Sequence, residues 1–185
     1  KKEITLARDH FGIKPLYFAR SNVDIVFCSS SRLVAGHPAV SSQLDADAIQ
    51  EFLQFRYLPS GNSFFRDVHS LPPGHLAIWT SGDLLIEPFW KPVLQPEPGR
   101  HSDEEFQEKL ASALDDAVHL QLRSDVPIGM FLSAGIDSSL IQQLAVRRSG
   151  APVKAFTFSI GDQHDEVTTA AETARRAELN HQVVH

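Results

Sequence analysis

Hydrophobic and polar positions follow different patterns in the two halves of this 185-residue chain. Through about residue 90, short apolar runs are separated by turn residues such as Gly, Pro, Asn and Asp, a pattern that predicts β-strands. We expect strands at residues 4–7, 16–19, 23–28, 75–79 and 84–86, and a helix from a cap at Asp45 to about Phe55. The last two strands face each other across Thr80-Ser81-Gly82-Asp83, which predicts a hairpin with Gly82 at its tip.

Helical periodicity dominates the second half. Ser102 opens it with a capping-box pattern, because Glu105 follows three residues later. The expected elements are a helix at 103–122, a strand at 126–132, a helix at 137–149, a strand at 153–160, a helix at 165–178 and a strand at 182–184. Strands that alternate with helices predict βαβ units and a parallel sheet. Between the halves, residues 91–101 hold three prolines and a glycine without apolar periodicity, which is typical of a linker.

The composition is that of an ordinary folded protein, with 42% hydrophobic and 22% charged residues. A net charge of −6 without a basic block argues against a nucleic-acid-binding surface. No run of 18 apolar residues occurs, so we expect no membrane-spanning helix. Cys28 is the only cysteine, which excludes an internal disulfide and a multi-cysteine zinc site. Because Cys28 falls inside an apolar strand, we interpret it as a small core residue.

The stretch richest in chemistry follows the strand at 126–132. There, Ser133-Ala134-Gly135 forms a loop of small residues that opens the next helix. Backbone N–H groups in such a loop, together with the positive end of the helix dipole, can hold a polyphosphate, and the hydroxyls of Ser138 and Ser139 add donors. Asp137 by itself would repel phosphate, so we interpret it as the ligand of a Mg²⁺ ion that bridges phosphate oxygens. The alternative is an ordinary capped helix start after a tight turn.

Several stretches resemble motifs of known enzymes. Residues 132–139 resemble the pyrophosphate loop, Ser-Gly-Gly-x-Asp-Ser, of ATP pyrophosphatases, and residues 122–129 resemble the run before this loop in glutamine-dependent asparagine synthetases. Further stretches resemble motifs of the same family in the family's order: 7–17, 71–75, 156–161 and 165–166. These matches span nearly the whole chain, so we identify it as similar to the glutamine-hydrolysing asparagine synthetase family.

The resemblance implies a two-domain enzyme. Residues 1–90 would be the C-terminal part of a glutaminase domain, an α+β N-terminal-nucleophile sandwich, and residues 91–101 a linker. Residues 102–185 would be the N-terminal part of an ATP-dependent synthetase domain, with the α/β parallel sheet of the adenine-nucleotide α-hydrolase-like ATP pyrophosphatase fold. The implied reaction is amidation of aspartate to asparagine with ammonia from glutamine, through a carboxyl-adenylate that releases AMP and pyrophosphate. ATP and Mg²⁺ are the implied cofactors. Glutamine, aspartate and ATP are the implied small-molecule partners, with no nucleic acid and no membrane. The implied location is cytoplasmic. The resemblance leaves open whether the full-length enzyme is a homodimer.

The resemblance also assigns roles to residues. Asp9 matches the aspartate that pairs with the ammonium of glutamine, and the alternative is a cap for the turn before Gly12. Its neighbour Arg8 is interpreted as structural. The ATP-binding positions are Leu132, Ser133, Gly135, Asp137, Ser138, Ser139 and Ile160. Among these, Asp137 is also the metal ligand, and Leu132 and Ile160 would contact the base and sugar through backbone groups.

Three departures from the family pattern qualify these expectations. Ala134 stands where the first loop glycine usually is, and a positive φ there would strain an alanine whereas a negative φ would accept it. We expect alanine to be tolerated, because the flanking loop residues all fit the pattern. The stretch between Gly161 and Asp165 is shorter than in the family, and we interpret Asp165 and Glu166 as a solvated helix start, with a place near the substrate entrance as the alternative.

The nucleophilic cysteine and the downstream acidic residue are missing, so we expect an internal fragment that contains no catalytic residue, is inactive alone and exposes apolar edges. Two rival hypotheses are a related amidotransferase or cyclase with another carboxylate acceptor, and a degenerate homologue without catalysis.

Overall fold

The computed structural model describes residues 3–21, 23–94, 102–149, 153–159 and 164–185, without the side chains of His164 and Asp165. The chain divides into two compact units, residues 1–95 and residues 96–185. In the described residues, three small three-stranded sheets make this a mixed α/β protein.

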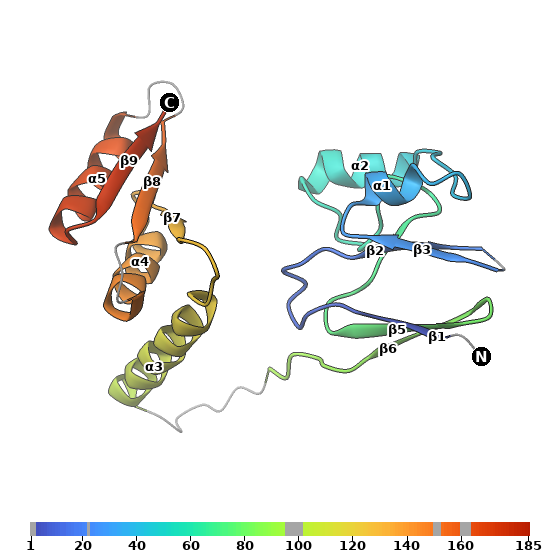
Figure 1. Cartoon of the computed structure of the whole chain (residues 1–185), viewed down its shortest axis with the longest axis horizontal. Helices are drawn as coiled ribbons and strands as arrows, with labels where there is room; N and C mark the ends of the chain where they lie inside the picture. The colour runs from blue at the N-terminus through green and yellow to red at the C-terminus, as the bar shows by residue number, and fades with distance from the viewer. Residues whose placement is uncertain (1–2, 22, 95–101, 150–152, 160–163) are drawn as a thin grey trace. The chain divides into compact units, whose positions relative to one another are not determined.

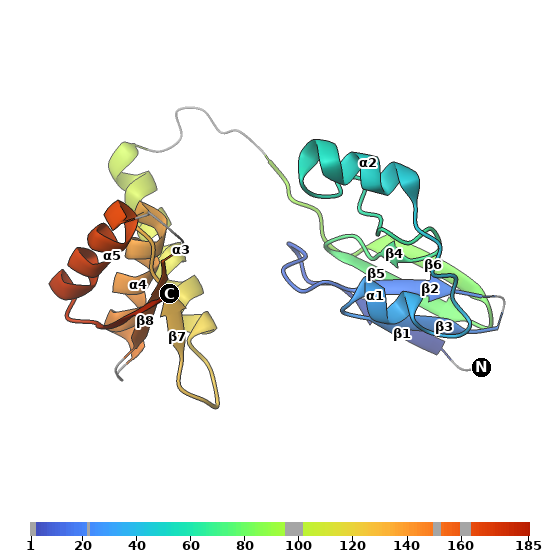
Figure 2. The ribbon, with the colours of Figure 1, turned by 90° about the horizontal axis from the view of Figure 1, so that it is seen from above.

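The first unit holds two antiparallel sheets and two helices (Figure 1). Its elements are β1 (Glu3–Ala7), β2 (Tyr17–Arg20), β3 (Ile25–Cys28), α1 (Ser31–Ala35), α2 (Ala46–Phe55), β4 (His69–Ser70), β5 (His75–Thr80) and β6 (Asp83–Pro88). One sheet has the strand order β1-β5-β6 and the other β3-β2-β4. In Figures 1 and 2, both helices lie over one face of the β3-β2-β4 sheet, and the β1-β5-β6 sheet lies against its other face.

Successive side chains of β2 point to opposite faces of its sheet and pack into two different hydrophobic clusters of this unit. Phe18 points to the space between the sheets, where it packs with Leu6, Leu71 and Ala77 from the other strands and loops. Its neighbour Ala19 points the opposite way, as successive strand residues do, and packs against α1. The partly buried Cys28 belongs to this second cluster, which agrees with its interpretation as a small core residue.

The hairpin at the end of this unit is confirmed. Strands β5 and β6 pair antiparallel, with Thr80 opposite Asp83. The two residues between them, Ser81 and Gly82, both have positive φ angles, 53° and 101°. This is the type I′ geometry whose twist matches that of the flanking strands. The helix after Asp45 is confirmed as well, since the Asp45 carboxylate accepts hydrogen bonds from the Asp47 and Ala48 amides.

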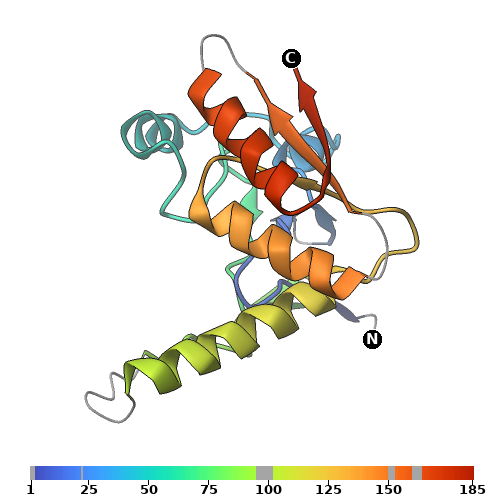
Figure 3. The ribbon, with the colours of Figure 1, turned by 90° about the vertical axis from the view of Figure 1, so that its left-hand side faces the viewer.

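The second unit has the expected alternation of helices and strands. Its elements are α3 (Asp103–Gln121), β7 (Gly129–Phe131), α4 (Ile136–Ser149), β8 (Lys154–Phe158), α5 (His164–Arg176) and β9 (Asn180–Val184). The strands form a parallel sheet in the order β7-β8-β9. Figure 3 shows α4 and α5 on the same side of this sheet, as right-handed crossovers require.

Both the start and the packing of α3 have local causes. The capping box is present, because the Ser102 hydroxyl accepts from the Glu105 amide and the Glu105 carboxylate accepts from the Ser102 amide, each at 3.2 Å. Near the other end of α3, Asp115 accepts hydrogen bonds from the Arg148 guanidinium of α4. The pair ties the two helices together and lowers the pKa of Asp115 below its ordinary value, chiefly through these hydrogen bonds.

The expected strand at 126–132 is shorter in the structure, where β7 covers Gly129–Phe131 only. Pro127 has no N–H for a ladder, and the Val126 amide donates to the Ser124 hydroxyl instead of to a strand. The expected strand at 153–160 likewise narrows to β8, and Ile160 lies outside the described residues. Two short elements, α1 and β4, are absent from the sequence expectations. Among the described residues, none of the helices has the length and apolar character needed to cross a membrane.

Candidate functional site

The small-residue loop lies at the carboxyl edge of the parallel sheet, where β7 ends and α4 begins. Leu132, the last apolar residue before the loop, is held on both sides by β8. Its N–H donates to the Phe156 carbonyl at 2.8 Å, and its own carbonyl accepts from the Thr157 hydroxyl at 2.7 Å. In open α/β sheets, ligands bind outside this edge. The fold therefore puts the loop where a ligand is expected.

The serines of the loop form one connected hydrogen-bond cluster. The Ser133 and Ser138 hydroxyl oxygens lie 2.9 Å apart. The Ser133 hydroxyl accepts from the Gly135 amide at 3.2 Å, and the Ser139 hydroxyl donates to the Gly135 carbonyl at 2.8 Å. The loop thus brings together Ser133, Gly135, Ser138 and Ser139, four of the predicted ATP-binding residues.

Asp137 lies in the exposed first turn of α4, where the backbone amides have no acceptor within the helix. The free amides at this helix start suit an anion, and the carboxylate suits a cation bound to that anion. In the part of the chain that the structure describes, no group of three or more His, Cys, Asp or Glu residues could hold a metal. Mg²⁺ needs no such group when phosphate oxygens and water complete its shell, since one or two carboxylates then suffice. The donor set therefore fits a magnesium–phosphate ligand.

The backbone accommodates alanine at position 134. Ala134 is not among the residues with positive φ, so it carries none of the strain that a left-handed conformation would impose. Gly135 also lies outside the left-handed region. A Cβ atom at Gly135 would lie 3.3 Å from the Ser133 hydroxyl, so glycine leaves room inside the serine cluster.

A cavity of about 310 Å³ opens beside this loop. Serines 133 and 138 form its polar side, and the remaining lining residues are Phe131, Leu132, Phe156, Thr157, Phe158 and Glu166. The rings of Phe131 and Phe158 are exposed, with centroids 5.3 Å apart. A polar loop next to an apolar wall is the usual composition of a small-molecule site, and the volume is at the lower end of the usual range.

Sequence reasoning missed the aromatic and threonine residues of this wall. The available signal was their place at the carboxyl end of an expected parallel strand, the edge where ligands bind in such sheets. Glu166 is exposed and lines the cavity, so the structure brings it near the loop. The side chain of Asp165 and the whole of Ile160 lie outside the described residues.

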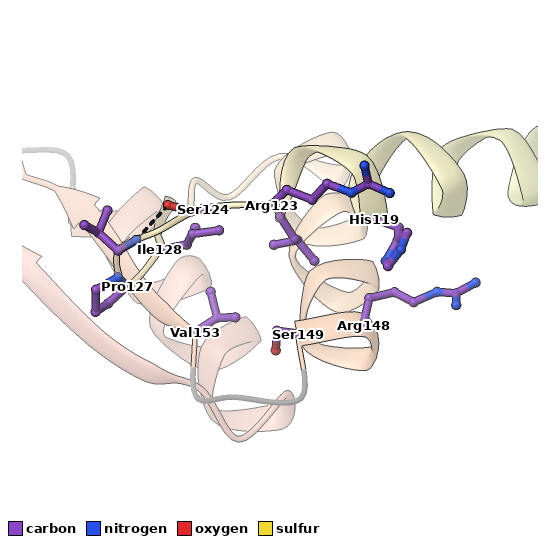
Figure 4. Close-up of a pocket in the computed structure, with 10 residues that line it drawn as sticks. His119, Arg123, Ser124, Pro127, Ile128, Arg148, Ser149 and Val153 are labelled. Atoms are coloured by element: carbon purple, nitrogen blue, oxygen red, sulfur yellow. Dashed lines mark hydrogen bonds between the residues drawn. The ribbon is translucent and has the colours of Figure 1, made fainter.

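A second cavity, of about 520 Å³, lies at the opposite edge of the same sheet (Figure 4). Basic side chains of His119, Arg123 and Arg148 lie at one side of it, and Pro127 and other apolar residues at the other. His119 and Arg148 lie in the last turns of α3 and α4, and Arg123 follows α3, so their positive charge stabilises the helix dipoles. Arg148 also already donates to Asp115. This cavity has no contact with the serine loop, so we assign the candidate site to the smaller cavity.

The other predicted site residue, Asp9, is in the loop between β1 and β2. Its carboxylate accepts from the Ile13 and Lys14 amides, both at 2.9 Å. These backbone donors, that of Lys14 first, hold the pKa of Asp9 below the ordinary carboxyl value. Asp9 therefore caps this loop, and its role in binding glutamine stays a prediction. An ionised carboxylate has about four acceptor positions, so the half-exposed Asp9 can still accept from an ammonium group.

Arg8 ties the Asp9 loop to the rest of the unit. Its guanidinium donates to the carbonyls of Gly12, Lys14 and Leu71, at 2.9, 3.2 and 2.7 Å, and to the Ser70 hydroxyl. These bonds span residues far apart in the sequence, which supports the interpretation of Arg8 as structural. On the other side of the loop, the ring of Phe11 packs edge-on against Trp90.

Two family models match the chain. The family described as Glutamine amidotransferase domain matches residues 1–90, and the family described as Asparagine synthase matches residues 109–185. The chain therefore joins amidotransferase sequence to asparagine synthase sequence in one polypeptide.

Individual relatives match most of the chain. Asparagine synthetase (glutamine-hydrolyzing) 1 of Bacillus subtilis (strain 168) is 34% identical over 174 residues, which are 91% of this chain and 26% of that protein. Asparagine synthetases (glutamine-hydrolyzing) 3 and 2 of the same organism are 30% and 28% identical, over 86% and 100% of this chain and 26% of each relative. The chain belongs to the family of glutamine-hydrolysing asparagine synthetases. It spans about a quarter of the length of these relatives.

Proposed function

We propose that the complete protein converts aspartate to asparagine with ammonia released from glutamine and with energy from ATP. The observation that carries this proposal is the succession of amidotransferase and asparagine synthase sequence along one chain, at 34% identity to a glutamine-hydrolysing asparagine synthetase. Residues 1–90 then form part of a glutaminase domain of the N-terminal-nucleophile type. After the linker at 91–101, residues 102–185 form part of a synthetase domain with the ATP pyrophosphatase fold. The cytoplasm, where these small molecules occur, is the proposed location.

The first unit would bind glutamine through Asp9. Its lowered pKa keeps this carboxylate ionised at neutral pH, which suits it to pair with the substrate ammonium. Because the Ile13 and Lys14 amides fix both carboxylate oxygens, the position of the charge is set before the substrate arrives. Asp9 therefore orients glutamine. We assign the nucleophile that attacks the glutamine amide to no residue of this chain.

The second unit would bind ATP at the serine loop. Free amides at the start of α4 would donate to the β- and γ-phosphates. The hydroxyls of Ser133, Ser138 and Ser139, which bond within the loop in this structure, would turn to donate to the same phosphates. Exposed Asp137 would hold Mg²⁺, which supplies charge neutralisation on the phosphate oxygens. The aspartate carboxylate then attacks the α-phosphorus, pyrophosphate leaves into the loop, and ammonia displaces AMP from the adenylate. Leu132 can contribute only the second lone pair of its carbonyl, because β8 already uses its N–H and the first.

Product analysis of the complete protein tests the reaction. With glutamine, aspartate and ATP, we expect asparagine, AMP and pyrophosphate in equal amounts. Release of ADP and phosphate would contradict adenylation. Turnover with a different carboxylic acid and none with aspartate would show that the acceptor is wrong.

Asp137→Asn tests the loop. This change should abolish ATP cleavage, by at least about 100-fold, while glutamine hydrolysis continues, because it removes a metal ligand and leaves the first unit intact. Asp116→Asn makes the same charge change at an exposed position of α3 and should leave ATP cleavage unchanged. Equal activity of Asp137→Asn and Asp116→Asn would show that Asp137 holds no metal.

A further inference from the structure

A buried hydroxyl beneath the serine loop has two partners from different strands. The Thr157 oxygen lies 2.7 Å from the Leu132 carbonyl oxygen and 2.8 Å from Nε2 of His181. Thr157 and Leu132 are only 3% and 2% exposed, and His181 is half-buried. Thr157 belongs to β8 and His181 to β9, and Leu132 directly follows β7, so one short series of polar atoms crosses the whole sheet.

The number of available protons determines which atom donates in each of these two hydrogen bonds. The threonine hydroxyl has one proton, and the Leu132 carbonyl oxygen can only accept. At 2.7 Å that carbonyl must receive the hydroxyl proton, since two oxygen lone pairs would otherwise face each other in the core. The hydroxyl oxygen is then an acceptor for His181, so the proton of the imidazole lies on Nε2. The resulting order is His181 Nε2–H to Thr157 O–H to the Leu132 carbonyl.

This order ends at the residue directly before Ser133. Strand β7 has three residues, and its ladder with β8 covers only Gly129 to Phe131. Beyond the ladder, the chain is held by the two bonds of Leu132, one from its N–H and one from Thr157. The side-chain bond therefore sets the direction in which the peptide between Leu132 and Ser133 points, and with it the Ser133 amide and hydroxyl.

We propose that Thr157 and His181 are positioning residues for the nucleotide loop: the hydrogen-bond relay from His181 through Thr157 to the Leu132 carbonyl holds the loop in the conformation that accepts phosphate. This proposal rests on the proposed binding of ATP at the serine loop. Neither residue touches the phosphates, so both act through the backbone.

Substitution of Thr157 in the complete protein tests the relay. Thr157→Val keeps the shape and removes the hydroxyl, and it should raise the KM for ATP about five- to tenfold, the effect of one lost hydrogen bond, with a smaller change in kcat. Thr157→Ser keeps the hydroxyl and should restore the wild-type KM. Thr173→Val removes a hydroxyl that donates within α5, to the Thr169 carbonyl, and should change nothing. An unchanged KM in Thr157→Val, or equal losses in the valine and serine variants, would overturn the proposal.

The tautomer of His181 gives a second, independent measurement. Nitrogen NMR of the imidazole in wild-type protein, at about pH 8 where a free histidine is neutral, should show the proton on Nε2. A proton on Nδ1 would overturn the relay, because Thr157 would then have to donate to His181 instead of to Leu132. This measurement decides the relay even when Thr157→Val does not fold. It also separates the two proposals: absence of ATP turnover in wild-type protein refutes the proposed function, whereas the tautomer refutes or supports the relay alone.

Discussion

Gln142 lies in the core of the second unit without a hydrogen-bond partner for its amide in the described residues. It is 1% exposed on α4, one turn after Ser138, and both its side-chain nitrogen and oxygen are buried. An unsatisfied buried polar group destabilises a protein by about 1–3 kcal/mol. The buried amide of Gln142 therefore lowers the stability of the second unit.

Replacing this amide should stabilise the protein. Gln142→Met keeps the length of the side chain and removes the unsatisfied atoms, so the free energy of unfolding should rise by about 1 kcal/mol in urea titrations. Gln143→Met, at the exposed neighbouring position, is the matched control and should change it by less than about 0.5 kcal/mol. A loss of stability in Gln142→Met relative to Gln143→Met would show that the amide has a partner.

Single residues also show where sequence information is enough. Ser102 and Glu105 are three positions apart, and their capping box follows from that spacing alone. The relay between Thr157 and His181 joins residues 24 positions apart, and nothing in either local sequence indicates it. Local spacing determines caps, whereas pairings across strands depend on the register of the sheet.

At the scale of elements, the loop from Arg8 to Leu16 connects β1 of one sheet to β2 of the other in the first unit. Gly12 adopts a φ of 65° in this loop, and a Cβ atom there would lie 2.8 Å from Cγ of Pro73. Both the backbone conformation and the close approach therefore require glycine.

Gly12→Ala should destabilise the first unit by about 2–3 kcal/mol, measured by urea unfolding with tryptophan fluorescence. Gly61→Ala is a matched control, because Gly61 has a similar φ of 73°, and a Cβ atom there would have no neighbour within 4 Å. That variant should lose only the conformational part, about 1 kcal/mol. Equal losses in both variants would mean that contact with Pro73 contributes nothing.

The helices and strands also show which elements the periodicity of the sequence could predict and which it could not. The hairpin of β5 and β6 and the helices α2 to α5 were predictable, because each has its own cap, turn or apolar period. The pair α1 and β4, with five and two residues, is too short for a period. Their place depends on packing, since Val34 and Ala35 of α1 are buried against β2.

At the scale of the whole molecule, carboxylates with lowered pKa occur in both units. Backbone donors lower the pKa of Asp9 in the first unit, and Arg148 lowers that of Asp115 in the second. A lowered folded pKa stabilises the folded state above the unfolded value of about 3.9, and this stabilisation is lost as the pH falls through the folded value. Acid should therefore weaken both units.

The two effects can be separated, because Trp79 and Trp90 are the only tryptophans and both belong to the first unit. Asp9→Asn should lower stability at pH 7 and flatten the dependence on pH below about 4, measured by tryptophan fluorescence in urea. Asp115→Asn should leave the fluorescence transition unchanged, since its contacts lie within the second unit. An unaltered acid dependence in Asp9→Asn would show that other groups cause it.

The sequence by itself determined the alternation of elements, the small-residue loop and the family, because these depend on neighbouring residues and on their order along the chain. Only the tertiary structure decided which groups of Leu132 are already bonded, that Ala134 is free of strain and that Asp9 caps its own loop. The physical reason is the same in each case. A hydrogen bond or a φ angle depends on where the folded backbone runs, and the site at the end of β7 is assembled by β8 and β9, which follow it in the sequence.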